Sequence, residues 1–468
     1  MSDLALLIPE LILAGMALAL ILAARRIQKT PVAVVGTVLA AIAAALASCW
    51  VLSWGAKIGF GGMITLDGYS QFFKVLVAAT LALAALLSVR GLDEAHVPRA
   101  EYHALLLLAS TGMMLVVSSR DLLPLWLGLE LMTLCSYILV GIRVERPSSN
   151  EAAIKYFLLG SFASAVLIYG ISLTYGVTGT TDFAGIASAL SKHGTGSNLL
   201  LLAAVGLVAA GLAFKIAAVP LHAWAPDAYQ GASAPVAAFL AAGSKAVGLA
   251  ALGRVCLAAY GSEAHFLSVV LAALAGLSIV VGSIIALSQT DMKRLLAYSS
   301  IAHAGYALLG LIAGTPEGAS ATMTYAFFYV FMTLGTFGVV AALGERGEKL
   351  DGYQGLAAQR PGIALLMLLF LMSLTGIPPT AGFAAKFVVI LSAVRAGYIA
   401  LAVLAVACSV VSAFFYMRVA VLMYMNKPQE PAPSRFPAPV AAALAVAALV
   451  TLIGGISPGS LARWTVSP

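Results

Sequence analysis

Two lysines lie inside runs of residues that are otherwise apolar enough to span a membrane. Lys215 and Lys245 flank a segment with an unusual share of proline and polar residues, namely Pro220, His222, Pro226, Asp227 and Pro235. A charged residue at the centre of a spanning helix costs roughly 2.5–3.5 kcal/mol on insertion scales. Two lysines and a broken polar segment at membrane depth therefore predict an ion or proton path.

A carboxylate in the middle of another apolar run is the next candidate for this chemistry. Glu130 lies well away from either end of LLPLWLGLELMTLCSYILVG, and on a helix its face also carries Trp126, Thr133 and Tyr137. This stripe should point into the protein rather than at lipid. We expect Lys215 to be the partner of Glu130, because pairing lowers the cost of burying either charge. A buried lysine in such a pair can release a proton and take it back.

Further charges lie in or near the apolar runs. Lys245 is in the middle of AAFLAAGSKAVGLAAL, and Lys386 follows a second proline-containing break in GIPPTAGFAAKFVVI. The alternatives for these lysines are a structural ion pair or a side chain that snorkels to the membrane surface. Snorkelling is the expectation for Lys74, which lies near the end of its run, and a structural role is the expectation for Glu10.

Several polar residues could connect these charges. Ser299, His303 and Tyr306 are spaced to share one helix face. The other supporting candidates are His222 in the broken segment, and Lys155 and Lys293, each near the start of an apolar run. Polar residues also simply hold spanning helices together, and Lys155 and Lys293 are equally consistent with charges that only fix orientation, so both alternatives stay open.

Composition places the whole chain in the membrane. Of its 468 residues 62% are hydrophobic and only 10% are charged, whereas about a quarter of the residues in an average soluble protein are charged. Runs of about 20 apolar residues are long enough to cross a bilayer as helices. Fourteen are predicted, near residues 4–24, 32–54, 70–90, 101–119, 122–142, 153–178, 199–220, 234–257, 266–288, 295–314, 319–343, 362–394, 397–424 and 437–456. The predicted fold is an all-α polytopic membrane protein.

Two of these helices are predicted to be broken, and their positions indicate an internal repeat. The seventh is interrupted around Pro220 and the twelfth around Pro378 and Pro379, and each is the fourth helix of a block of five. Helices 4–8 and 9–13 are therefore predicted to be inverted repeats, as in transporters with discontinuous helices. The alternative is that the prolines merely kink two helices. The predicted units are residues 1–100 (helices 1–3), 101–260, 261–426 and 427–468 (helix 14).

The basic residues predict the orientation. Loops after odd-numbered helices carry fourteen of the 26 lysines and arginines, and the other side, with the C-terminal tail, carries six. By the positive-inside rule the odd loops are cytoplasmic and both termini face outward.

Missing motifs narrow the function. The chain has no GxGxxG, no P-loop and no cluster among its four cysteines, so we expect it to bind no nucleotide, metal or iron–sulfur centre by itself. It cannot perform redox chemistry alone. Any energy source other than an ion gradient must then come from a partner.

Four segments carry a family resemblance: LLLLASTGMMLVVSSRDLLPLWLGLELMTLCSYILVG, EAAIKYFLLGSFASAVLIYG, FKIAAVPLHAWAPDAYQGASAPVAAFLAAGSKA and GIPPTAGFAAKF. They resemble subunit N of proton-pumping NADH:quinone oxidoreductase, respiratory complex I. The likeness is strongest between residues 100 and 390. It implies an antiporter-like subunit of fourteen helices, whose relay residues correspond to Glu130, Lys215, Lys245 and Lys386. Lysine at position 386 resembles subunit N, where subunit M has glutamate, and we expect no long lateral helix of the subunit L type.

The resemblance also implies the setting. NADH, FMN, iron–sulfur clusters and quinone are expected in partner subunits, with M-type and small K/J-type membrane subunits and lipid as neighbours, no nucleic acid partner, and a bacterial inner membrane as the location. The function it implies is proton translocation driven by redox chemistry in those partners. A free-standing cation/proton antiporter, the equivalent subunit of a ferredoxin-driven complex, and an inert scaffold remain as alternatives.

Overall fold

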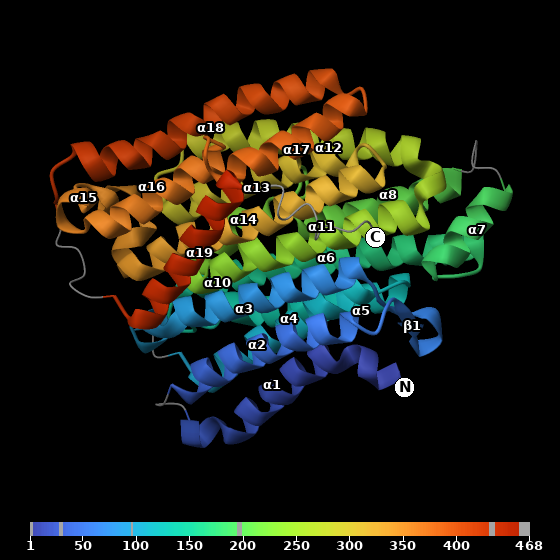
Figure 1. Ribbon diagram of the computed structural model, residues 1–468, viewed down its shortest axis with the longest axis horizontal. Coiled ribbons are helices and arrows are strands. Elements are labelled where there is room, and N and C mark those ends of the chain that lie inside the picture. Colours follow the sequence, from blue (N-terminus) through green and yellow to red (C-terminus); the bar gives the residue numbers. More distant parts are fainter. Residues whose placement is uncertain (1–2, 28–30, 95–96, 194–198, 430–435, 458–468) are drawn as a thin grey trace.

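The chain folds into a bundle of helices whose axes are roughly aligned (Figure 1). The computed structural model describes residues 3–27, 31–94, 97–193, 199–429 and 436–457. Within these residues eleven helices are long and apolar enough to cross a membrane. They are α1 (Ile8–Ile27, after a short 3-10 turn), α2 (Val32–Leu52), α3 (Gly68–Glu94), α4 (Arg99–Ser118), α5 (Leu122–Val140), α6 (Pro147–Thr178), the continuous α10 (Ala234–Phe239) and α11 (Lys245–Arg254), α12 (Ala264–Leu287), α14 (Pro316–Leu343), α18 (Ile399–Met425) and α19 (Ala438–Ile456).

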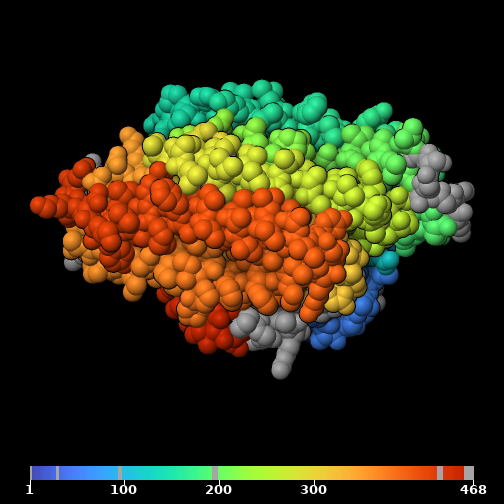
Figure 2. Space-filling view, turned by 90° about the horizontal axis from the view of Figure 1, so that it is seen from above, coloured from blue at the N-terminus to red at the C-terminus, as the bar shows by residue number. Residues whose placement is uncertain are grey.

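The other predicted spans are also helical. They are the less apolar α13 (Met292–Leu311) and two broken helices, α8 (Leu199–Lys215) with α9 (Trp224–Gly231), and α16 (Pro361–Thr375) with α17 (Ala381–Arg395). Together with the eleven, these helices account for the fourteen predicted runs. The prediction of an all-helical polytopic membrane protein is confirmed. Figure 2 shows the face on which α18 lies along the bundle beside α12.

Both predicted helix breaks are present, between α8 and α9 and between α16 and α17, where prolines interrupt the helical backbone hydrogen bonds. Proline has no N–H to donate to the preceding helical turn. The residues at Pro220 and at Pro378–Pro379 are non-helical. Helix α16 ends at Thr375, and the next residue, Gly376, has a φ of 89°, a left-handed conformation that suits glycine. Ala217, just after α8, also has a left-handed φ of 56°. Each break leaves the last carbonyls of a helix without intrahelical partners at membrane depth.

Two pairs of helices repeat the same local structure. Asp121 caps the start of α5 and forms a β-bridge with Asp182, which follows α6. Asp291 caps the start of α13 and forms a β-bridge with Lys349, which follows α14. Helix α4 packs closely on α5, and α12 packs closely on α13. These correspondences support the predicted relation between the two blocks of five helices.

Two small elements were not predicted from the apolar runs. A two-stranded antiparallel sheet, β1 (Lys57–Gly59) and β2 (Ile64–Leu66), joins α2 to α3, and helix α7 (Phe183–His193) follows α6. Next to the sheet, Asp67 accepts hydrogen bonds from Arg254 Nη1 and Nη2 at 2.8 and 2.9 Å. Burial raises the pKa of Asp67, but the hydrogen bonds and charge of Arg254 outweigh it and lower that pKa from its ordinary value. The pair attaches the loop before α3 to α11.

The prediction that Lys74 snorkels is wrong. Its side chain is only 1% exposed, and Nζ lies 2.7 Å from Oε1 of the equally buried Glu10. Helix α3 is covered by α2, α4, α10, α14 and α19, so an amine on it has no short path to the surface. The structural role expected for Glu10 agrees with this ion pair, which joins α1 to α3.

This ion pair allows a test of its contribution to stability. We expect Lys74→Met to destabilise the chain by about 3–5 kcal/mol, because it leaves the carboxylate of Glu10 buried and unpaired. The double variant Glu10→Leu with Lys74→Met should recover most of that loss, since both charges are then gone. Thermal unfolding of the purified assembly measures both. A single variant as stable as the wild type, or a double variant no better than the single, would contradict the assignment.

Candidate functional site

Three lysines that the sequence singled out are buried on three different helices. Lys215, at the end of α8, is 4% exposed, Lys245, at the start of α11, is 1% exposed, and Lys386, in α17, is 5% exposed. All three point into the protein rather than at lipid, as expected. None of them forms a salt bridge within the described residues, and each amine donates instead to uncharged oxygen atoms.

Glu130 and Lys215 are neighbours but do not form the predicted ion pair. Lys215 Nζ donates to Thr133 Oγ1 at 2.7 Å, one turn along α5 from Glu130. Glu130 Oε1 accepts a hydrogen bond from Ser164 Oγ of α6, which in turn accepts from Trp126 Nε1 at 3.0 Å. The carboxylate remains close enough to Lys215 for electrostatic interaction. The stripe of polar residues on α5 therefore faces inward as predicted, and each of the two charged groups is hydrogen-bonded to a different hydroxyl.

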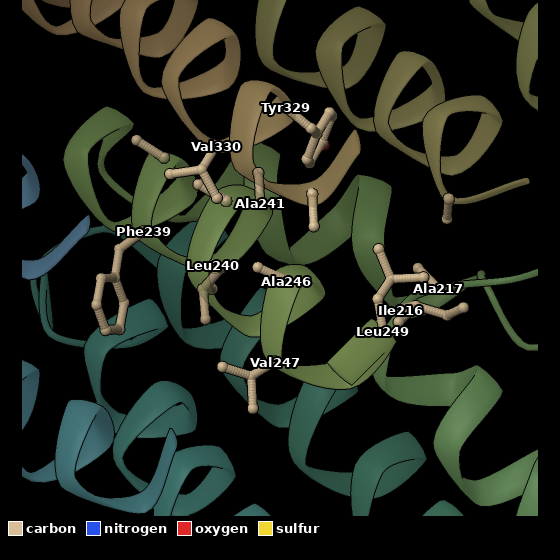
Figure 3. Close-up of a cluster of buried hydrophobic side chains, with 14 of the residues drawn as sticks. Ile216, Ala217, Phe239, Leu240, Ala241, Ala246, Val247, Leu249, Tyr329 and Val330 are labelled. Carbon is tan, nitrogen blue, oxygen red and sulfur yellow. The ribbon is translucent and has the colours of Figure 1, made fainter. Parts of the chain in front are cut away.

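Helices α8 and α11 pack closely at Gly248, which lies beside Lys215 and three residues after Lys245. A Cβ atom added to Gly248 would lie 2.7 Å from Ile216 Cγ2 and 3.5 Å from Lys215 Cβ. Only glycine fits this contact without displacing a neighbour. Figure 3 shows the apolar side chains around the contact, with Ile216 and Ala217 beside Leu249. Apolar side chains therefore fill the contact between α8 and α11 next to Lys215.

Lys245 lies at an irregular point of its helix. The five residues Leu240–Ser244 before it form a π-helix, a local widening that is frequent at functional sites. Its Nζ donates to the backbone carbonyl of Ser300 in α13 at 2.5 Å. The buried hydroxyl of Tyr229 faces Ser300 Oγ, and neither oxygen has a hydrogen-bond partner of normal geometry in the described part of the chain. Buried polar atoms of this kind are where proteins hold ordered water.

A chain of hydroxyl and imidazole groups follows α13 towards the third lysine. Ser299 Oγ and His303 Nε2 both contact Tyr416 OH, the latter at 3.4 Å, and His303 Nδ1 lies 2.7 Å from Tyr325 OH. Tyr306, one turn further along, places its ring 4.5 Å from Lys386 Nζ. The predicted face of Ser299, His303 and Tyr306 is thus buried and lies between Lys245 and Lys386.

The break in the second broken helix holds Lys386. Its Nζ donates to the carbonyl of Thr375 at 2.8 Å and to Ser409 Oγ at 2.9 Å. Thr375 is the last residue of α16, so its carbonyl has no intrahelical partner. The negative end of the helix dipole lies at the same point. The break therefore supplies the oxygen that stabilises the buried ammonium group.

The other supporting candidates lie outside the row of buried groups formed by Glu130, the three lysines and the polar residues that contact them. His222 is half-buried in the first break, and its Nδ1 has no hydrogen-bond partner among the described residues. Lys155 is 47% exposed and pairs with Glu151 at 2.7 Å and Asp227 at 3.2 Å. Lys293 is 1% exposed and pairs with Glu348. Within the described residues no group of three histidine, cysteine, aspartate or glutamate side chains could hold a metal ion.

Sequence reasoning missed several members of the row. They are Ser164, Tyr325, Tyr416 and Ser409. Each lies on a different helix from the group that it contacts, and no spacing rule relates the two. The sequence offers only a general indication for such residues: a polar residue in an apolar run usually faces protein rather than lipid, but its partner is not specified.

Comparison with known proteins identifies the family. Residues 119–412 match the family model described as NADH:quinone oxidoreductase/Mrp antiporter, TM. The chain is 44% identical to NADH-quinone oxidoreductase subunit N of Desulfovibrio desulfuricans, over 99% of this chain and 96% of that protein.

Solved structures agree with this comparison. A chain of respiratory complex I from Thermus thermophilus with bound aureothin is 34% identical, with a TM-score of 0.84 over 98% of this chain and all of that chain. A chain of the Mrp complex from Dietzia sp. shares the fold, with a TM-score of 0.88 at 22% identity over 98% of this chain and 96% of that one. The chain therefore belongs to the family of NADH:quinone oxidoreductase subunit N, the antiporter-like membrane subunits of complex I.

Proposed function

We propose that this subunit conducts protons along a row of buried groups, Glu130, Lys215, Lys245 and Lys386, while partner subunits oxidise NADH and reduce quinone. The observation that carries the proposal is the state of the three amines. Each is buried and held by hydroxyl or carbonyl oxygens, with no carboxylate in salt-bridge range within the described residues. A lysine without a fixed counter-ion can exist in the neutral form at modest cost, so it can pass a proton on.

Coupling between the sites follows from electrostatics. Like charges in a low-dielectric interior disfavour one another, so protonation of one lysine favours release from its neighbour. The hydroxyl and imidazole groups of Ser299, Tyr416 and His303 supply the link between Lys245 and Lys386. The link between Lys215 and Lys245 is apolar at Ile216 and requires water that enters at the break beside His222.

The setting of the relay belongs to the same proposal. FMN, iron–sulfur clusters and quinone are held by other subunits, and M-type and K/J-type membrane subunits and lipid are the neighbours. The chain spans a bacterial inner membrane, with the loops after its odd-numbered spans in the cytoplasm and both termini on the outer side of the membrane. The C-terminal residues 458–468 are not among those that the structure describes. Residues 101–260 and 261–426 act as the two repeats, between residues 1–100 and 427–468.

Removal of the first pair of groups tests the proposal. We expect Lys215→Ala and Glu130→Ala to assemble into the complex but to lose most coupled proton pumping, because each removes a proton carrier. Lys215→Arg should also fail, since guanidinium does not release its proton at accessible pH. Proton uptake by inverted membrane vesicles during NADH oxidation measures this, with the exposed Lys427→Ala as control. Normal pumping in assembled Lys215→Ala would rule out the relay.

A second test addresses the link along α13. Tyr416→Phe should slow pumping, because it removes the hydroxyl between Ser299 and His303. Tyr260→Phe is a matched control, since the hydroxyl of this equally buried tyrosine lies 2.7 Å from Thr174 Oγ1, outside the row. Each loses about 0.5–1.5 kcal/mol of stability with its hydrogen bond, so their thermal stabilities should be similar. Equal pumping by the two variants would show that Tyr416 is structural.

A further inference from the structure

A large cavity opens among the loops that follow the third, fifth, seventh and eleventh membrane spans, which are α3, α5, the broken α8–α9 and α14. Its volume is about 700 Å³. Its charged lining residues come from the end of α3 and from the loops after α5 and α14, and they are Arg90, Arg143, Glu145, Arg146, Glu345, Arg346 and Glu348. Ser233, Ala234 and Pro235 line it from the start of the helix that carries Lys245. This cavity is therefore polar, large enough for many water molecules, and adjacent to the helix of the second lysine.

One carboxylate of the cavity reaches into the protein. Glu348 is 25% exposed, and its Oε1 accepts a hydrogen bond from Lys293 Nζ at 2.8 Å. Lys293 itself is only 1% exposed and also donates to the carbonyl of Ala232 at 3.0 Å. By contrast, Glu345 pairs with Arg146, a residue that also lines the cavity. Glu348 thus connects cavity water to a buried amine, and Glu345 does not.

The buried amine lies on the helix face that leads to Lys245. Lys293 and Ser300 are seven residues apart on α13, so they share a face about two turns, or roughly 10 Å, apart. The carbonyl of Ser300 holds Lys245 Nζ. The buried hydroxyls of Ser300 and Tyr229 face each other, but neither forms a hydrogen bond of normal geometry in the described part of the chain. These polar atoms can bind water between the two amines.

We infer that Glu348 and Lys293 form a proton inlet that supplies Lys245 directly from the cavity, an inference that rests on the proposed function. The Glu348 carboxylate takes a proton from hydronium in the cavity and leaves water. The ammonium group of Lys293 then has no counter-ion, so it can release a proton through water bound at Tyr229 and Ser300 to the neutral amine of Lys245. The carboxylic acid of Glu348 gives its proton to the amine of Lys293, which is now neutral, and the ion pair is restored.

The competing explanation is that the pair only fastens the loop after α14 to α13. A neutral amide distinguishes the two, because Glu348→Gln can still accept a hydrogen bond from Lys293 but cannot carry a proton. We expect proton uptake in vesicles with the intact complex to be at least about tenfold slower. A positioned proton-transfer group typically contributes about 10²–10⁴-fold to a rate. Glu345→Gln, in the same cavity, should pump normally, and Glu348→Asp should recover part of the rate.

The outcomes separate this inference from the function on which it rests. Normal pumping by Glu348→Gln together with loss in Lys245→Ala overturns the inlet and leaves the relay standing. Normal pumping by Lys245→Ala overturns the relay itself. Equal losses in Glu348→Gln and Glu345→Gln would indicate a general effect of cavity charge and would also contradict the inlet.

Cavity access supplies a measurement that does not depend on activity. A cysteine at Ser233, in a chain whose exposed Cys49 is replaced by serine, should react with a membrane-impermeant thiol reagent in inside-out vesicles but not in right-side-out vesicles. Bulky labelling should then reduce pumping. Absence of labelling in inside-out vesicles would show that the cavity is closed to cytoplasmic water, and it would overturn the inlet even if Glu348→Gln failed to assemble.

Discussion

The structure depends on how an ammonium group is stabilised inside an apolar bundle. Burying a charge is costly unless oxygen atoms replace its water, and a fixed carboxylate would trap the proton. This chain uses uncharged oxygens: Thr133 for Lys215, the Ser300 carbonyl for Lys245, and the Thr375 carbonyl for Lys386. The contrast is Lys74, whose 2.7 Å ion pair with Glu10 suits a structural joint between helices.

The irregular backbone segments follow from that requirement. A regular helix consumes its carbonyls internally, so oxygens for a buried cation are most accessible where a helix ends. The break after Thr375 supplies one for Lys386, and Lys215 itself is the last residue of α8. Prolines at both breaks prevent the helices from continuing. The same features that look like defects in a spanning helix thus provide oxygen atoms for buried lysines, and these lysines are the members of the proposed relay.

Much of this could be predicted from sequence, and the failures share a cause. The spans, both breaks and the buried lysines followed from local apolar runs, prolines and the cost of isolated charges. Ser164 as the partner of Glu130, and Glu10 as the partner of Lys74, could not be predicted, because each pair joins helices by packing that no local pattern records. The π-helix before Lys245 and the hydrogen-bonded Tyr416 are invisible for the same reason.

Proton transfer along the row is tested most directly by the ordered water in an experimental structure of the intact complex at a resolution that shows individual water molecules. Such transfer predicts water at the hydroxyls of Tyr229 and Ser300, and polar contacts of no more than about 3.5 Å from Lys245 through Tyr416 and His303 to Lys386. A dry apolar layer across that stretch, with the unpartnered hydroxyls rotated onto other protein atoms, would contradict proton transfer along the row.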